Sequence, residues 1–380
     1  MGQAELLSMI VPLWAVLMGV SPSGIGALIA AKSLLTLFLA IHGGAMMDRL
    51  GARRVMLFFA AFTGCVAALY PALPWFPLMI LLQMLIGFSS NMSWIGAQTI
   101  IAQIGRGDPG KIGTFSFYAR IGNIVAPLLM GMLWDAVGPM LSFLGITVWC
   151  SCLFFAISRL EKPATQTIER VTWRDVLPRL SDYTGSVKLI VLPVVAFTLA
   201  ISFTRHSTSA AEHSFLIVYL REAGFLGTMI GAMFSAAEIC NGLGSLLSGR
   251  VAKHFPMTWL MLGFTMLSIL LLALTPLTGG VYALLALSHA LRRGFEGIVQ
   301  PLMFSLQARA VSRDLQGAVV GLRVTNNRLS SVITPLIMGL IVEFFGLANG
   351  FYAMGALLLA GCCALAIAVA RSPALRTGEI

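Results

Sequence analysis

The chain has 380 residues, of which 58% are hydrophobic and 11% are charged. An average soluble domain carries charge on roughly a quarter of its residues, so this composition excludes an ordinary soluble protein. The net charge of +10 does not indicate nucleic acid, because nearly all basic loop residues fall in alternate loops and the opposite set holds Arg221 alone. By the positive-inside rule, this distribution predicts a membrane protein with both termini in the cytoplasm.

A hydrocarbon core about 30 Å thick needs roughly 20 apolar residues per helix. About twelve such stretches lie between punctuating loops, which predicts an all-α polytopic membrane protein with about twelve transmembrane helices. In chain order, the predicted spans are 1–19, 23–46, 54–73, 77–104, 113–137, 139–159, 188–220, 226–248, 256–276, 280–308, 316–345 and 349–370.

The second half of the sequence repeats the first at an offset of about 205 to 208 positions. The segment "ARIGNIVAPLLMGMLWDAVG" of the fifth span matches "NRLSSVITPLIMGLIVEFFG" of the eleventh, and "SGIG" ending at Gly26 matches "TMIG" ending at Gly231. The repeat predicts an N-terminal six-helix half over 1–160 and a C-terminal six-helix half over 188–380. Residues 161–187, rich in charges and turn formers, are predicted to form a cytoplasmic linker between them.

The repeat also indicates that the first helix is short. Met1 aligns with His206, which lies well inside the seventh span, so roughly fifteen residues before that point have no counterpart. We therefore expect a truncated first helix, either because the start codon is misassigned or because the sequence is a fragment.

A charged turn, "GGAMMDRLGARR" at 43–54, separates the second and third spans. Together with two six-helix repeats, this turn resembles the major facilitator superfamily, whose loop signature reads approximately GxxxDRxGRR. The resemblance implies that the turn closes the cytoplasmic side of the outward-facing state, with its Asp near the N-terminus of a helix in the other half. A carboxylate there gains up to about 1 kcal/mol. The matching residues are Gly44, Asp48, Arg49, Gly51, Arg53 and Arg54, with Ala52 as one extra residue.

Two further family signatures bear on function. The fifth-helix signature of exporters is kept in spacing but has two glycines replaced, at Ala126 and Met130, which favours efflux; small residues and a proline also serve plain helix packing. Its matching residues are Gly113, Gly122, Pro127 and Gly131. In the fourth helix, Gln83 stands where the family's proton-coupling signature has an arginine, so the sequence departs from that pattern.

Ionisable residues within the predicted spans are candidate functional groups, because a charge near the bilayer centre costs about 2.5 to 3.5 kcal/mol. Helical spacing places many of them on polar stripes of the seventh and tenth spans, and Asn91 and Trp94 on a weaker stripe of the fourth. The resemblance implies that these helices and the first line a central cavity. The bases are Lys32, Arg120, Arg205, Arg292, Arg293, Arg323 and Arg328, the acids are Glu212, Glu238 and Glu296, and the histidines are His206, His213 and His289.

Structural roles are the alternative for several of these groups. Either Arg292 or Arg293 could form an ion pair with Glu296 on its own helix, and Arg205 could pair with Glu212. Arg120 and Arg328 lie at matching places in the fifth and eleventh helices, where they could extend to the membrane interface. Alternatively, Arg120 could meet Glu238 and hold a gate shut. Lys32 has no evident partner along its own helix, which favours a role at a gate or with substrate.

These observations predict a secondary active transporter of the cell inner membrane, working by alternating access. We expect proton coupling through a buried carboxylate or histidine, efflux as the direction, a monomer, and a small organic solute that is anionic or zwitterionic, since basic cavity groups outnumber acids. No phosphate loop, nucleophile motif or metal-ligand cluster occurs, so we expect no enzyme activity, cofactor or metal. The alternative is a non-transporting sensor or assembly protein on the same fold, or a defective truncated transporter.

Overall fold

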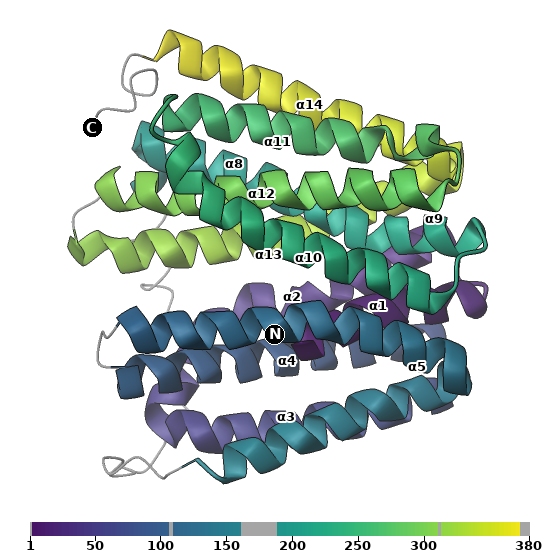
Figure 1. Cartoon of the computed structure of the whole chain (residues 1–380). Helices are drawn as coiled ribbons and strands as arrows, with labels where there is room; N and C mark the ends of the chain where they lie inside the picture. The colour runs from purple at the N-terminus through teal and green to yellow at the C-terminus, as the bar shows by residue number, and fades with distance from the viewer. Residues whose placement is uncertain (1, 106–108, 161–187, 311–312, 373–380) are drawn as a thin grey trace. The chain divides into compact units, whose positions relative to one another are not determined.

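The computed structural model describes residues 2–105, 109–160, 188–310 and 313–372 (Figure 1). The predicted linker at 161–187 lies outside the described residues. Within the described ranges the chain forms helices and no strands. This agrees with the expectation of an all-α protein.

Five helices make up the described part of the first half. A glycine with φ of 80°, Gly138, interrupts the last of them and is followed directly by Pro139, so this segment contains both the fifth and the sixth predicted spans. The helices are α1 (Gly2–Leu17), α2 (Pro22–Met46), α3 (Ala52–Leu69), α4 (Phe76–Gly105) and α5 (Pro109–Ser158).

The second half follows the same order. The predicted seventh span is divided into α8 (Pro193–Ala211), a π-helical turn η4 (Glu212–Leu216) and α9 (Ile217–Glu222). It begins later than residue 188, because Pro193 fixes the first turn of α8 and residues 188–191 form a separate 3-10 turn. The remaining helices are α10 (Gly227–Val251), α11 (Met257–Ala273), α12 (Tyr282–Ala310), α13 (Arg313–Phe345) and α14 (Leu347–Arg371).

Seven of the described helices are long and apolar enough to cross a membrane by length and composition, and α1 and α11 are shorter apolar helices. The helices outside this apolar set include α8 and α12. These two carry most of the buried ionisable side chains, which lowers their hydropathy.

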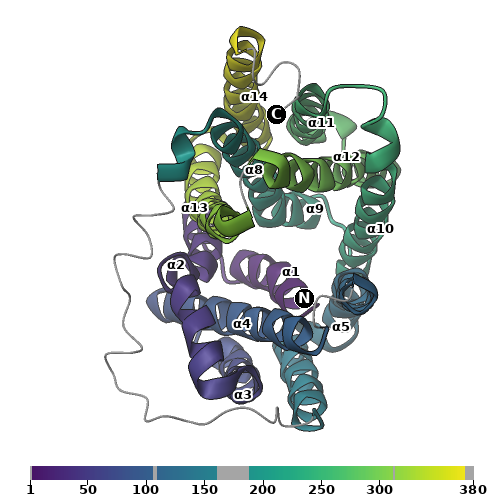
Figure 2. The same cartoon turned by 90° about the vertical axis from the view of Figure 1, so that its left-hand side faces the viewer.

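The chain divides into two compact units. Unit 1 comprises Met1–Val20, Ala27–Arg179 and Leu226–Gly231, and unit 2 comprises Ser21–Gly26, Leu180–Phe225 and Ala232–Ile380. In unit 1, α3 packs against α4 and α5, and α1 packs against α5 (Figure 1). In unit 2, α8, α12 and α13 pack together, as an end-on view shows (Figure 2), and α11 packs between α12 and α14.

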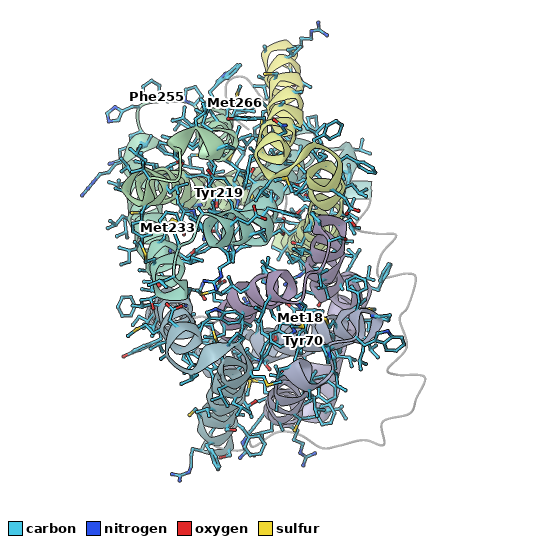
Figure 3. All side chains as sticks on the ribbon, turned by 90° about the vertical axis from the view of Figure 1, so that its right-hand side faces the viewer. Met18, Tyr70, Tyr219, Met233, Phe255 and Met266 are labelled. Atoms are coloured by element: carbon cyan, nitrogen blue, oxygen red, sulfur yellow. The ribbon has the colours of Figure 1, made fainter. Side chains whose placement is uncertain are left out.

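Aromatic and aliphatic side chains fill the interior of each unit. In unit 1, Tyr70 stacks on Phe143 with ring centroids 5.0 Å apart, and Trp14 meets the same ring edge-on at 5.6 Å. Figure 3 marks Tyr70 in this unit. In unit 2, buried Ile201 on α8 and Met261 on α11 belong to one apolar cluster. Because lipid is as apolar as these side chains, close packing is what holds such helices together.

The positions that carry the sequence repeat form two equivalent helix crossings. In unit 1, a Cβ at Gly131 of α5 would overlap the carbonyl oxygen of Gly227, at the start of α10. In unit 2, a Cβ at Gly26 of α2 would overlap the carbonyl oxygen of Pro335 on α13. Glycine is therefore needed at both crossings, because the backbones approach each other without room for a side chain.

A carboxylate accompanies each crossing. Asp135 of α5 accepts hydrogen bonds from the Gly227 nitrogen at 2.9 Å and from the Thr228 nitrogen at 2.6 Å, in the first turn of α10. Its repeat partner, Glu343 of α13, accepts a hydrogen bond from the Ser23 nitrogen at 2.9 Å, in the first turn of α2. Both acids satisfy backbone N–H groups that have no partner inside the helix.

Candidate functional site

A buried chain of ion pairs in unit 2 joins three carboxylates to two guanidinium groups. Glu296 of α12 pairs with Arg292 and with Arg293, both on its own helix, with N to O distances of 2.6 Å each. Arg292 also pairs with Glu212 of the π-turn, and Arg293 pairs with Glu238 of α10. The order along this ion chain is Glu212, Arg292, Glu296, Arg293, Glu238.

One histidine and two serines extend the ion chain. His289 of α12 contacts Glu212 through Nδ1, so the ring stands at one end. Ser209 of α8 donates a hydrogen bond to Glu296 at 3.3 Å and accepts one from Arg293 at 3.3 Å. Ser268 of α11 donates to the other oxygen of Glu296 at 3.4 Å. Five helical elements, α8, the π-turn, α10, α11 and α12, therefore contribute to one polar cluster.

Burial varies along the ion chain. The side chains of Glu212, Arg292 and Glu296 are at most 2% exposed, whereas Arg293 and Glu238 are 13% and 14% exposed. Charges so deeply buried are retained at a high desolvation cost, which is offset only by pairing and hydrogen bonding. The Glu238 end is the more accessible one.

The ion chain contains more carboxylates than guanidinium groups. Its three carboxylates face two guanidinium groups, so one negative charge exceeds the direct pairing. Arg205 attracts Glu296 at longer range and forms no ion pair with it. A single proton on His289 or on a carboxylate would balance the ion chain itself, and such a group changes its protonation more readily than a fully paired one.

Glu212 lies at the start of the π-turn and takes its partners from α12. A π-turn accommodates one residue more than a regular helical turn and is frequent at functional sites. It begins at Glu212, and the structure pairs this carboxylate with His289 and Arg292 of α12. The alternative pairing with Arg205 on its own helix is not formed, whereas both alternatives for Glu296 are formed at once.

A second polar group in unit 2 is basic, and it consists of Arg205, His206, Arg323 and Arg328. Arg205 is 8% exposed and its Nη2 lies 3.3 Å from Nε2 of His206. Arg323 of α13 stacks over the ring of Phe304 on α12, with 4.2 Å between its central carbon and the ring centroid. The charges of all three arginines act on the His206 ring.

The predicted residues of unit 1 have contacts within their own unit. Lys32 of α2 donates hydrogen bonds to the Ala4 carbonyl oxygen at 3.0 Å and to Ser8 at 2.6 Å, both on α1. No partner was evident along the same helix in the sequence, and the structure shows that the partners of Lys32 lie on the neighbouring helix α1. Trp94 stacks on Phe115 with ring centroids 5.7 Å apart. Asn91 is half-buried on the same helix as Trp94.

The charged turn is described in part. Gly51 has φ of 87°, a conformation that favours glycine, and ends the π-turn η1 (Met47–Gly51). Arg53 donates to the carbonyl oxygens of Ile157 at 3.2 Å and Ser158 at 2.6 Å, so it caps the C-terminus of α5. Arg54 is exposed. The side chains of Asp48 and Arg49, and the surroundings of Gly44 and Gly113, lie outside what the structure describes.

The other predicted helix-5 and gate residues have different neighbours. Gly122 of α5 lies against α1, where an added Cβ would stand 3.3 Å from the Gly2 nitrogen. The carbonyl oxygen of Pro127 meets Gly231 in the first turns of α10. Arg120 and Arg328 are both half-buried. Glu238, considered above as a partner of Arg120, is engaged by Arg293.

The sequence placed Arg323 among the ionisable candidates without assigning it a role, and it did not indicate Ser209 as a bridge or Ser268 and Phe304 at all. A serine or phenylalanine in an apolar helix carries no signal of its own.

One hollow of about 450 Å³ lies on unit 2 and is apolar. Figure 3 marks Phe255, one of its lining residues, at the edge of this unit. The lining contains no ionisable side chain, so the hollow does not belong to the candidate site. It is lined by Phe255, Pro256, Trp259, Leu260, Gly263, Phe264 and Leu267.

Comparison with known families and relatives adds independent information. A family model described as Major Facilitator Superfamily matches the chain twice, over residues 1–220 and 208–379. The MFS-type transporter YuxJ of Bacillus subtilis is 24% identical over 315 residues, which cover 80% of this chain and 76% of that protein. The quinolone resistance protein NorA of Staphylococcus aureus is 20% identical over 350 residues, which cover 91% and 88%.

Solved structures of transporters have the same fold. The nucleoside transporter NupG matches with a TM-score of 0.78 at 14% identity, over 96% of both chains. A D-xylose–proton symporter matches with a TM-score of 0.72 at 10% identity, over 96% of this chain and 94% of that one. At these identities the likeness concerns the fold alone.

Proposed function

Because the chain belongs to the Major Facilitator Superfamily, we propose that it exports a small organic anion or zwitterion across the inner membrane, driven by protons. It is a membrane transport protein of this family, and its relatives act on small molecules. The single observation that carries the proton coupling is the buried ion chain with three carboxylates and two guanidinium groups.

The ion chain supports proton coupling through its charge balance. When unprotonated it holds one carboxylate more than its guanidinium groups can neutralise, and an uncompensated buried charge is costly. Uptake of one proton at the Glu212–His289 end or at Glu238 removes that cost. We propose that this proton and the solute bind in alternation, so that each conformational cycle exchanges one for the other.

Export is the proposed direction, with two supporting observations. The fifth helix keeps the spacing of the exporter signature at Pro127 and Gly131, and these positions form the tight crossing with the start of α10. A relative covering most of the chain is named for quinolone resistance, a property that removal of a compound from the cell would confer. We further propose a monomer with its C-terminus in the cytoplasm, following the positive-inside distribution.

The test is transport by the full chain reconstituted in liposomes under an imposed pH gradient. The probes are radiolabelled benzoate, glycine betaine and tetraphenylphosphonium, which represent an anion, a zwitterion and a cation. We expect benzoate or betaine to accumulate against its gradient as protons leave the lumen. Glu212→Gln should abolish this accumulation and retain solute exchange, whereas the exposed control Glu222→Gln should behave as wild type.

Each alternative outcome has a defined meaning. Equal solute movement with and without the pH gradient would contradict proton coupling, and accumulation only when the gradient is reversed would contradict export. Accumulation of tetraphenylphosphonium alone would contradict the proposed solute charge. If none of the three probes moves in the wild type, the result contradicts the transport of these solute classes and favours a non-transporting protein on the same fold.

A further inference from the structure

We infer that Arg205 and Arg323, with His206 beside them, form the binding site for a carboxylate group of the solute. The inference rests on the proposed function and names the chemical group that its site would recognise. It is carried by two arginines of unit 2, the buried Arg205 and the half-buried Arg323, each of which has a buried Nε without a hydrogen-bond partner among the described residues.

Arg205 is the first of these groups. Its side chain is 8% exposed on α8, and its Nε is buried without a hydrogen-bond partner. The Nη2 of its guanidinium lies 3.3 Å from Nε2 of His206. Among the described residues no carboxylate forms an ion pair with it. A buried donor in this state costs free energy, and an entering acceptor would remove that cost.

Arg323 is the second group, and it comes from a different helix. Its Nε is likewise buried without a hydrogen-bond partner, and the central carbon of its guanidinium lies over the ring of Phe304, 4.2 Å from the centroid. Stacking on an aromatic face leaves the edge of the guanidinium plane free to donate. The part of the chain that the structure describes gives Arg323 no ion pair.

The two arginines belong to one neighbourhood. Their helices α8 and α13 pack against each other in unit 2 (Figure 2). Each guanidinium acts electrostatically on the other, and both act on His206. Like charges held together in a low-dielectric interior repel each other, so binding of an anion between them is favoured.

The nearby carboxylates of the ion chain do not pair with Arg205 or Arg323. Glu296 attracts Arg205, yet its two oxygens are already paired with Arg292 and Arg293 and hydrogen-bonded by serines. The ion chain and the basic pair therefore divide the polar interior of unit 2 into an acidic part for a proton and a basic part for an anion. Glu296 belongs to the ion chain and attracts Arg205, so the two parts are linked electrostatically.

A carboxylate is the expected ligand group. It is planar and accepts two parallel hydrogen bonds from one guanidinium fork, a geometry that lysine cannot offer. The stacked Phe304 provides an apolar surface next to the charge. We therefore expect an organic carboxylate with an apolar body, and benzoate is a suitable probe.

The experiment measures benzoate binding to the purified full chain in detergent by isothermal titration calorimetry, with benzyl alcohol as the uncharged analogue and inorganic phosphate as a competing oxyanion. We expect benzoate to bind and benzyl alcohol not to bind. Arg205→Gln and Arg323→Gln should each weaken benzoate binding about tenfold or more, as loss of a charge-assisted hydrogen bond predicts. Arg205→Lys should fall between wild type and Arg205→Gln.

The matched control is Arg250→Gln, which removes an exposed arginine near the end of α10 and should leave binding unchanged. The melting temperature of each variant without ligand identifies a variant that has failed to fold, and in that case the Arg205→Lys result decides for Arg205. Absence of benzoate binding to the wild type, binding that is equal in all variants, or tighter binding of phosphate than of benzoate would each overturn the assignment.

The outcomes separate this inference from the proposed function. Arginine-dependent benzoate binding without solute movement in liposomes would keep the carboxylate site and reject transport. Proton-driven movement of another solute that is unchanged in Arg205→Gln and Arg323→Gln would keep transport and reject the site.

Discussion

Arg292 lies between two carboxylates, Glu212 and Glu296, and is 2% exposed. At the scale of single residues, this arrangement shows what spacing along a helix can and cannot predict. The pairing of Arg292 or Arg293 with Glu296 follows from positions three and four residues apart on one helix. The contacts of Glu212 with α12 and of Arg293 with α10 link helices far apart in sequence, and no local pattern predicts them.

We predict that Arg292→Met is strongly destabilising, by about 3 to 5 kcal/mol, because it leaves two buried carboxylates without their shared cation. Thermal unfolding in detergent, followed by tryptophan fluorescence, measures the effect. The double variant Arg292→Met with Glu212→Gln should recover part of the loss, since one of the stranded charges is removed. The control is Arg221→Met at an exposed position. An unchanged melting temperature for Arg292→Met would contradict the buried pairing.

At the scale of helices, the main features are the two crossings at which backbones touch. The repeat found in the sequence aligned Pro127 with Pro335 and Gly131 with Gly339, and these positions turn out to lie at two equivalent backbone contacts. The sequence predicted the equivalence but not the partners, because a repeat shows which positions are alike and not which helices they touch. The helix boundaries were predicted closely, since polar turns and prolines mark them, whereas the π-turn at Glu212 has no marker in the sequence.

We predict that Gly131→Ala lowers stability by about 1 to 3 kcal/mol, because the added Cβ meets the fixed backbone of Gly227 and not a movable side chain. The matched control is Gly249→Ala, on a helix position with nothing within 4 Å of the added atom. That control should be neutral or stabilising by up to about 1 kcal/mol, the intrinsic helix preference of alanine over glycine. Equal melting temperatures for the two variants would reject the tight crossing.

We predict that Asp135→Asn loosens the first turn of α10, because it weakens hydrogen bonds to two backbone N–H groups and removes a charge at a helix N-terminus. The expected cost is about 0.5 to 2 kcal/mol. Hydrogen–deuterium exchange with mass spectrometry should show faster exchange in the peptide that contains Gly227 and Thr228. Glu222→Gln, at an exposed position nearby in sequence, serves as the control. Unaltered exchange would show that the carboxylate is dispensable there.

At the scale of the whole molecule, two six-helix repeats give two compact units, each of which includes a short segment from the other repeat. Composition and the repeat predicted the class of fold, and the charged turn predicted the family. The positions of the polar clusters were harder to predict from the sequence. The cost of burying a charge requires that a partner exist, but it does not identify which residue that partner is.

We predict that the halves 1–160 and 188–380 are each less stable alone than together. The first fragment lacks Leu226–Gly231 and the second lacks Ser21–Gly26, the segments that complete the two units. Co-expression of both fragments should restore co-purification and the melting temperature of the intact chain, whereas each fragment alone should be degraded faster by trypsin. A first fragment that is as protease-resistant alone as in the pair would contradict this expectation.

The π-turn at Glu212–Leu216 also sets the rotation of α8 relative to α9. A π-turn holds one residue more than a regular turn, so deleting a single residue there would let the helix become regular. Each residue of an α-helix accounts for about 100° of rotation. Such a deletion would swing Arg205 and His206 about a quarter-turn around the axis relative to α9, which would remove the carboxylate site while leaving the hydropathy of the span unchanged. Insertions and deletions within this one turn would therefore change which solute the protein recognises, while its insertion in the membrane would stay the same.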